Sequence, residues 1–129
     1  MGSSEAVTRG VRVEVESFYV PDNSIPVESH YFFAYQVTVQ NEGDLSVQLV
    51  SRRWLITDAN GNEQVVEGEG VVGEQPMLKP GEGFQYTSFC PLPTPAGSMR
   101  GSYRMIDSEG REFDAEVAVF SLNVPGSMN

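Results

Sequence analysis

The sequence is poor in basic side chains. Among its 129 residues, 8 are lysine or arginine and 18 are aspartate or glutamate, which gives a net charge of -10. Nucleic-acid binding depends on lysine and arginine side chains that neutralise phosphates, so this composition argues against a nucleic-acid partner. An acidic surface keeps a protein soluble, and it suits a basic protein or a cation as a partner.

Cysteine and histidine are almost absent, with Cys90 and His30 as the single examples. One cysteine cannot form an internal disulfide, which indicates a reducing compartment such as the cytoplasm. One cysteine and one histidine are too few for a structural zinc site, and no base–nucleophile pair stands at a recognisable spacing. We therefore expect a protein that is not an enzyme and holds no cofactor, although its carboxylates could bind Mg²⁺ or Co²⁺ weakly.

Long apolar runs and helical periodicity are also missing. No stretch approaches the roughly 18 apolar residues of a membrane span, so no membrane insertion is expected. Apolar residues instead alternate with polar ones at a period of two, which is typical of strands with one buried face. The longest such stripe comprises Tyr31, Phe33, Tyr35, Val37 and Val39.

Turn signals separate the alternating segments. Asn60-Gly61, for example, predicts a hairpin between a strand region at 47–57 and a return strand at 63–67. About seven or eight short strands of this kind predict an antiparallel, all-β sandwich of two sheets. We expect one domain over residues 10–125, a loose N-terminal tail over 1–9 and a short C-terminal tail over 126–129.

Residues 68–76, here called the 68–76 loop, carry a Gly-x-Gly-x-x-Gly pattern at Gly68, Gly70 and Gly73. In a dinucleotide-binding fold, such glycines open a helix whose N-terminus holds the pyrophosphate. Pro76 and Pro80 leave no room for that helix, so a Rossmann-type site is rejected.

Two interpretations of the 68–76 loop stay open. Its backbone N–H groups could form a nest for an anion, with a metal ion bridging the anion to Glu69 and Glu74. Without a metal these two carboxylates would repel phosphate. The other interpretation is a tight turn between strands in which glycine supplies positive φ.

Three further residues, Arg52, Arg53 and Trp54, join the candidate ligand-binding set. In a strand, one arginine shares the face of the tryptophan and the other points away. The guanidinium groups could bind a carboxylate or a phosphate, or they could be exposed neighbours of a core tryptophan. Arg100 and Arg104 share a phase on a later strand, and whether they converge with Arg53 is open.

The region around the 68–76 loop is also apolar, since it contains Val71, Val72, Met77 and Leu78. Some of these side chains are expected to pack into the sandwich, and the rest could form a groove for a peptide. Loops on a rigid β-scaffold are common places for binding.

Four segments resemble the ApaG family in order and spacing. They are residues 53–58 (RWLITD), 68–76 (GEGVVGEQP), 86–88 (YTS) and 97–103 (GSMRGSY), and the resemblance extends from about residue 11 to residue 125. It implies a fibronectin type III-like or immunoglobulin-like β-sandwich. It also implies a bacterial cytoplasmic protein, or a domain of larger eukaryotic proteins such as some F-box proteins, where it acts as a protein-interaction module.

The family is associated with cobalt and magnesium resistance and with the diadenosine tetraphosphatase encoded alongside it. Its glycine motif has been proposed to bind phosphate-bearing ligands, a proposal that carries over only to Gly68, Gly70 and Gly73. Phe89 is a departure, because bacterial members usually have glycine after the Tyr-Thr-Ser motif. We therefore expect a protein-binding module, with a binder of pyrophosphate or (di)nucleotide as the alternative. An exposed edge strand could also pair two copies as a homodimer.

Overall fold

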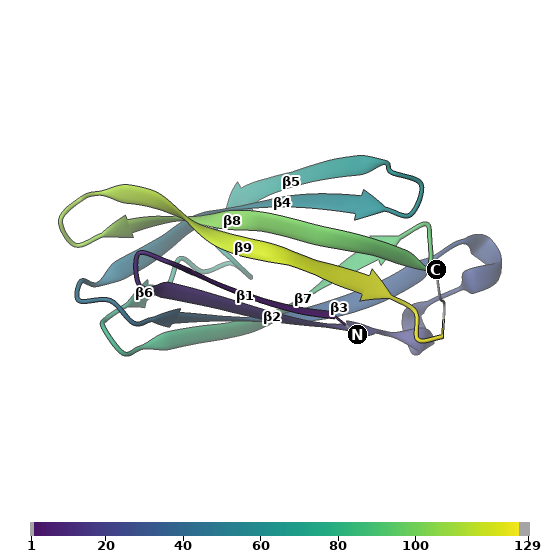
Figure 1. Cartoon of the computed structure of the whole chain (residues 1–129), viewed down its shortest axis with the longest axis horizontal. Coiled ribbons are helices and arrows are strands. Elements are labelled where there is room, and N and C mark those ends of the chain that lie inside the picture. The colour runs from purple at the N-terminus through teal and green to yellow at the C-terminus, as the bar shows by residue number, and fades with distance from the viewer. Residues whose placement is uncertain (1, 127–129) are drawn as a thin grey trace.

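The chain folds into two antiparallel sheets packed face to face, as the computed structural model of residues 2–126 shows (Figure 1). One sheet has the strand order β1-β2-β3-β7, and the other has the order β5-β4-β8-β9 with β6 paired to β4. The predicted all-β sandwich is confirmed, and its finer fibronectin type III or immunoglobulin-like class stays a prediction. The strands of the described residues are β1 (Gly2–Thr8), β2 (Val11–Tyr19), β3 (Tyr31–Asn41), β4 (Val47–Asp58), β5 (Glu63–Glu69), β6 (Met77–Leu78), β7 (Gly83–Leu92), β8 (Ala96–Asp107) and β9 (Glu112–Asn123).

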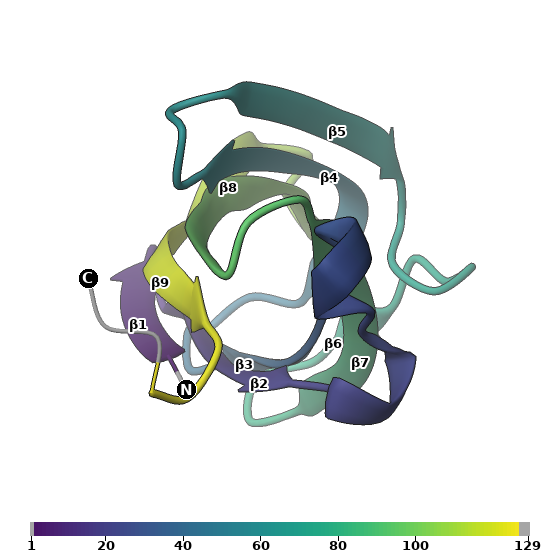
Figure 2. The same ribbon diagram turned by 90° about the vertical axis from the view of Figure 1, so that its right-hand side faces the viewer.

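The core lies between the two sheets, where the alternating apolar residues predicted from the sequence meet (Figure 2). Burying one face of each strand removes its apolar side chains from water, which is the main force that holds the layers together. The inner residues of β2 and β3 are Val11, Val13, Val15, Phe33, Tyr35, Val37 and Val39, and all of them are buried.

The N-terminal segment differs from its prediction. The sequence predicts a loose tail over residues 1–9, but the structure shows β1 paired with β2 along its whole length. The Ser17 hydroxyl also donates to the carbonyl oxygen of Ser121 at 2.6 Å, which links β2 to β9. Because β1 is held by backbone hydrogen bonds more than by apolar side chains, its sequence carries little strand signal. With β1 and the two-residue β6, the described residues form nine strands rather than seven or eight.

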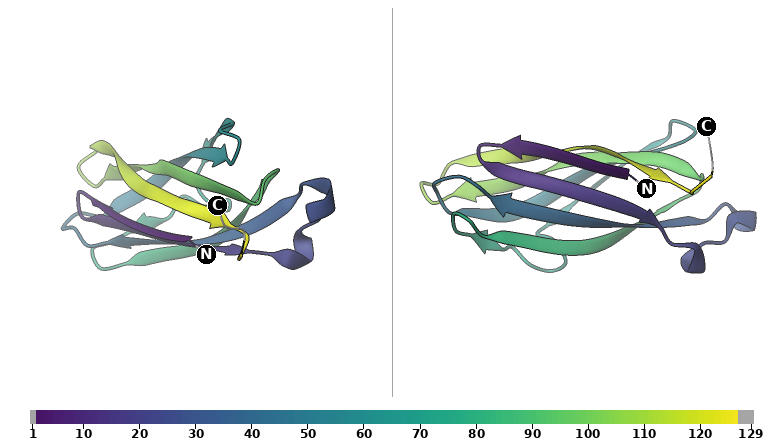
Figure 3. Two further views of the ribbon diagram at one scale, coloured as in Figure 1. Left: turned by 45° about the vertical axis from the view of Figure 1, so that its right-hand side comes forward. Right: turned by 60° about the horizontal axis from the view of Figure 1, so that its bottom comes forward.

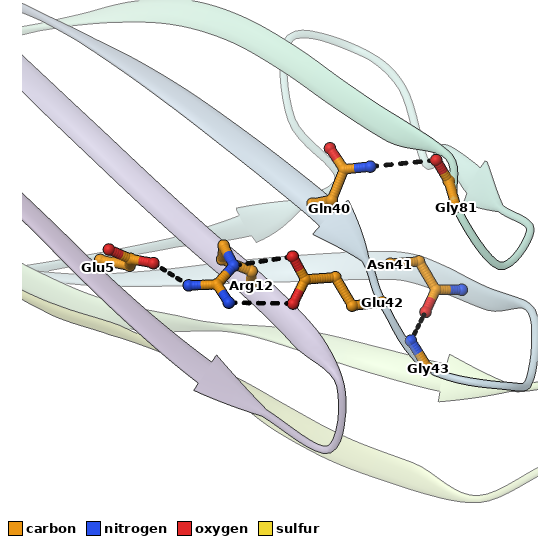
Figure 4. Close-up of polar contacts among 7 residues, drawn as sticks. All are labelled: Glu5, Arg12, Gln40, Asn41, Glu42, Gly43 and Gly81. Atoms are coloured by element: carbon orange, nitrogen blue, oxygen red, sulfur yellow. Dashed lines mark hydrogen bonds and ion pairs between the residues drawn. The ribbon is translucent and has the colours of Figure 1, made fainter.

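Arg12 of β2 contacts both β1 and the turn after β3 (Figure 4). The Arg12 guanidinium donates to both carboxylate oxygens of Glu42, at 2.9 and 3.1 Å, and also pairs with Glu5 of β1. The hydrogen bond from Arg12 lowers the pKa of the Glu42 carboxyl. Both partners are solvent-exposed, so this contact serves mainly to fix geometry.

The turn after β3 is closed by a buried asparagine. The Asn41 side chain accepts a hydrogen bond from the Gly43 N–H at 3.0 Å (Figure 4). Its amide group also donates to the carbonyl oxygens of Leu45 and Leu78. A buried amide needs such partners to offset its lost hydration. Of the predicted C-terminal tail, only Gly126 belongs to the described residues, and residues 127–129 lie outside them.

Candidate functional site

The 68–76 loop continues β5 and ends in a tight hairpin. The backbone N–H groups of Val71 and Glu74 donate to each other's carbonyl oxygens, at 2.8 and 2.9 Å. The two residues between them, Val72 and Gly73, both have positive φ, at 43° and 81°. This pair of conformations characterises a type I′ turn, which suits the twist of a two-stranded hairpin.

Val72 is the unusual residue of this turn. A β-branched side chain seldom adopts positive φ, because its Cβ substituents crowd the following carbonyl, and glycine or asparagine normally fills this position. Val72 is nevertheless 56% exposed, so core packing does not account for the conformation. Strained backbone of this kind concentrates at functional sites, where surrounding contacts hold it in place.

Apolar residues around the turn divide between core and solvent, as the sequence led us to expect. Val71 and Leu78 are buried in the core cluster, and they anchor the loop to the sandwich. Val72 and Met77 are exposed and present apolar surface to solvent. The turn is therefore attached to the sandwich at its base, and its tip projects into solvent.

Each of the three motif positions holds glycine for a different physical reason. A β-carbon at Gly68 would lie 2.7 Å from the guanidinium of Arg52, and one at Gly70 would overlap the carbonyl oxygen of Glu74. Nothing lies near Gly73, which is required only by its positive φ. Two glycines thus allow close approach and one makes the turn.

Most backbone N–H groups of the loop already have partners within the protein. The N–H of Gly70 donates to the carbonyl of Val50 at 2.8 Å, and those of Val71 and Glu74 close the turn. An anion nest requires several N–H groups directed at one point. Only Val72 and Gly73 lie between the paired donors, and binding of phosphate there stays a prediction.

Arg52 and Arg53 lie on opposite faces of β4, as strand alternation requires. Arg52 donates to the carbonyl oxygens of Glu69 and Gly70, at 3.1 and 2.8 Å, and so fastens the 68–76 loop to β4. Arg53 forms an ion pair with Glu67 across the exposed β4–β5 pair, at 3.1 Å. The first arginine positions the loop, and the second belongs to the outer face of the sheet.

Arg53, Arg100 and Arg104 do converge on this outer face. Arg53 and Arg104 line one hollow of about 470 Å³, and Arg53 and Arg100 line a neighbouring one of about 440 Å³. Acidic residues compensate much of the charge, because Arg104 pairs with Glu112 and Asp114. The patch is therefore mixed in charge rather than strongly basic.

Trp54 is a candidate ligand-binding residue in the sequence, but the structure places it in the core. Its ring makes edge contacts with Tyr35, Tyr103 and Phe120, and its indole N–H has no hydrogen-bond partner among the described residues. Trp54 and Arg52 lie on the same, inner face of β4, because residues two apart in a strand point to the same side. A ligand in solvent cannot reach the ring without displacing the sheet.

The remaining reactive groups do not assemble into a catalytic arrangement in the described residues. The ring of His30 lies beside Phe32, and burial raises the pKa of the Cys90 thiol to about 11. A thiol of that kind is a poor nucleophile at neutral pH. Within residues 2–126, no three His, Cys, Asp or Glu side chains gather closely enough to hold a metal ion.

Comparison with known proteins settles the relationship of the chain. The family model described as the ApaG domain matches residues 21–107. The chain belongs to the ApaG family. Protein ApaG of Anaeromyxobacter dehalogenans (strain 2CP-1) is 54% identical over 126 residues, which cover 98% of this chain and 99% of that protein. Protein ApaG of Beijerinckia indica is 53% identical over 121 residues, with 94% and 93% covered.

Solved structures show the same arrangement. The crystal structure of an ApaA protein from Bordetella pertussis is 47% identical and matches with a TM-score of 0.88, covering 91% of this chain and 95% of that one. The C-terminal domain of wzt matches with a TM-score of 0.56 at 14% identity, which shows a shared fold alone. Among the described residues, no helix has the length and hydrophobicity needed to cross a membrane.

Proposed function

We propose that this ApaG domain is a cytoplasmic, non-catalytic protein-binding module whose contact surface is the 68–76 loop, and that it acts in cobalt and magnesium ion homeostasis. The observation that carries the proposal is Val72, an exposed apolar side chain held with a positive φ of 43° at the tip of an anchored hairpin. Glycine or asparagine would relieve the strain at little cost in burial. The valine side chain is therefore better explained by contact with a partner than by folding.

The anchoring of the loop supports the same proposal. Arg52 holds the loop carbonyls, and Val71 is buried beneath the turn. A surface that is already ordered loses little conformational entropy when a partner binds, which favours affinity. Val72 and Met77 supply apolar contacts, and Glu69 and Glu74 supply negative charge that suits a basic partner.

The test compares the proteins captured from bacterial lysate by three forms of the domain. We expect wild type and Val65→Asn to retain a shared protein that Val72→Asn loses. Val65 is the matched control because it is an exposed valine on β5, away from the turn. Equal capture by all three forms would show that the 68–76 loop is not the contact surface.

The alternative function is binding of pyrophosphate or a (di)nucleotide by the same loop, with Mg²⁺ or Co²⁺ as a bridge. It is favoured by the N–H groups of Val72 and Gly73 at the tip of the hairpin. An amide NMR titration with pyrophosphate, ATP and diadenosine tetraphosphate, each with and without the metal, tests it. Saturable shifts confined to the loop would favour it, and Glu74→Gln should then strengthen metal-free binding by removing a repulsive charge.

A further inference from the structure

The four sheet edges of the described strands differ in how far they are protected from pairing with another strand. The edge strands β1 and β9 lie beside each other, where Thr8 accepts a hydrogen bond from the Glu116 N–H at 3.1 Å (Figures 1 and 2). The β5 edge carries three glutamates, at Glu63, Glu67 and Glu69. The β7 edge has neither protection, because its ten residues, GFQYTSFCPL, contain no charge and no described strand pairs with its outer side (Figure 3).

The free edge of β7 presents backbone groups at known positions. The Val20 N–H donates to Phe32, so even-numbered residues of β3 bond to β2 and odd-numbered residues bond to β7. Tyr35 of β3 stands opposite Ser88, which places the bonded residues of β7 at even numbers. The N–H and C=O groups of Gln85, Thr87 and Phe89 therefore point outward from the sheet.

We propose that two copies of this chain join through β7, antiparallel about a two-fold axis at Thr87. In this register, Thr87 stands opposite Thr87 of the partner subunit, and Gln85 stands opposite Phe89 of the partner subunit. Pro91, which has no N–H, then falls at the end of the ladder, where a missing donor matters least. The two four-stranded sheets become one continuous sheet of eight strands.

Charge favours a second copy at this edge and disfavours it at the other exposed one. Each copy carries a net charge of -10, so close approach requires an uncharged contact. The β7 strand offers one, whereas antiparallel self-pairing of β5 about Val66 would place Glu63 against Glu69. Like charges directly opposite each other destabilise a strand pair.

Exposed aromatic surface adjoins the same edge. Phe89 is 57% exposed, and its ring stacks on that of Phe32 with centroids 5.4 Å apart. The cross-strand partner of Phe89 on β3 is Ala34, whose small side chain leaves the Phe89 ring uncovered on the side of the free edge. Pairing through β7 brings Gln85 of the partner subunit against this ring and covers apolar surface. The β7 edge lies apart from the 68–76 loop in sequence and does not use it for this contact.

Sedimentation equilibrium from micromolar to millimolar protein tests the proposal. Wild type is expected to show a monomer–dimer equilibrium, and Thr87→Glu is expected to weaken it by roughly fivefold or more, since two carboxylates then face each other. Gln64→Glu adds the same charge to the exposed β5 strand and should dimerise as wild type does. Thr87→Lys should weaken the dimer likewise when alone, and an equimolar mixture with Thr87→Glu should restore dimerisation to the wild-type level.

Two results would overturn the proposal. One is a wild-type protein that stays monomeric at millimolar concentration. The other is a dimer that Thr87→Glu and Gln64→Glu affect equally, which would place the contact elsewhere. Circular dichroism of each variant checks that the monomer fold is unchanged, and Thr87 is exposed, so the fold is expected to tolerate both charges.

Discussion

The hydroxyl groups of Tyr86 and Tyr103 hydrogen-bond to each other across the interior of the sandwich, one from β7 and the other from β8. They connect the two sheets by a polar contact within an otherwise apolar core. Both rings are buried, and burial raises the pKa of both phenols. The stability of the sandwich therefore depends on both phenols being present and protonated.

Removing both of these hydroxyls should destabilise the fold by less than the two single removals added together. Tyr103→Phe leaves the Tyr86 hydroxyl buried without a partner, which should lower the free energy of unfolding by about 1–3 kcal/mol. Tyr86→Phe/Tyr103→Phe leaves no unpaired group, so its loss should be smaller than the sum of the two single losses. Urea unfolding measures all three, and strictly additive losses would contradict the coupling.

The same pair predicts a stability loss at alkaline pH. Because the folded-state pKa values lie above those of unfolded tyrosine, the folded state holds its phenolic protons more tightly. The contribution is complete below pH ~10, where unfolded tyrosine titrates, and it declines as pH rises further. Urea midpoints at pH 8 and above 10 should show this decline in wild type, and Tyr86→Phe/Tyr103→Phe should show less of it.

The turn at Val72 predicts a substitution that stabilises the fold. Val72→Asn should raise the free energy of unfolding by about 1 kcal/mol, because asparagine tolerates positive φ and little burial is lost. Val65→Asn is the control, since an asparagine within a strand should be neutral or destabilising. Thermal unfolding compares them, and a less stable Val72→Asn would show that the valine serves the fold itself.

The two adjacent arginines of β4 should behave differently. Arg52→Met removes two hydrogen bonds to loop carbonyls, so it should cost about 1–2 kcal/mol and speed amide hydrogen exchange within the 68–76 loop. Arg53→Met removes an exposed ion pair with Glu67, which should cost less than about 1 kcal/mol. If both variants left exchange in the loop unchanged, Arg52 would not be its anchor.

The sequence predicts the sandwich because strand alternation along β2, β3 and β9 directly records which side chains are buried. It does not predict β1, since that strand depends on backbone pairing with β2 and not on an apolar stripe. The sequence also does not predict that Val71 is buried and Val72 exposed, because only the turn geometry determines which valine faces the core. Likewise, alternation separates Arg52 from Arg53, but the carbonyls that Arg52 binds come from the folded loop.

A photo-crosslinking residue placed at position 72 in living bacteria would report directly what contacts the tip of the 68–76 loop. The same residue at position 65 provides the comparison on a neighbouring exposed strand. We expect a discrete protein adduct from position 72 that is absent from position 65. No protein adduct at position 72, or the same adducts at both positions, would contradict the assignment of this loop as the binding surface.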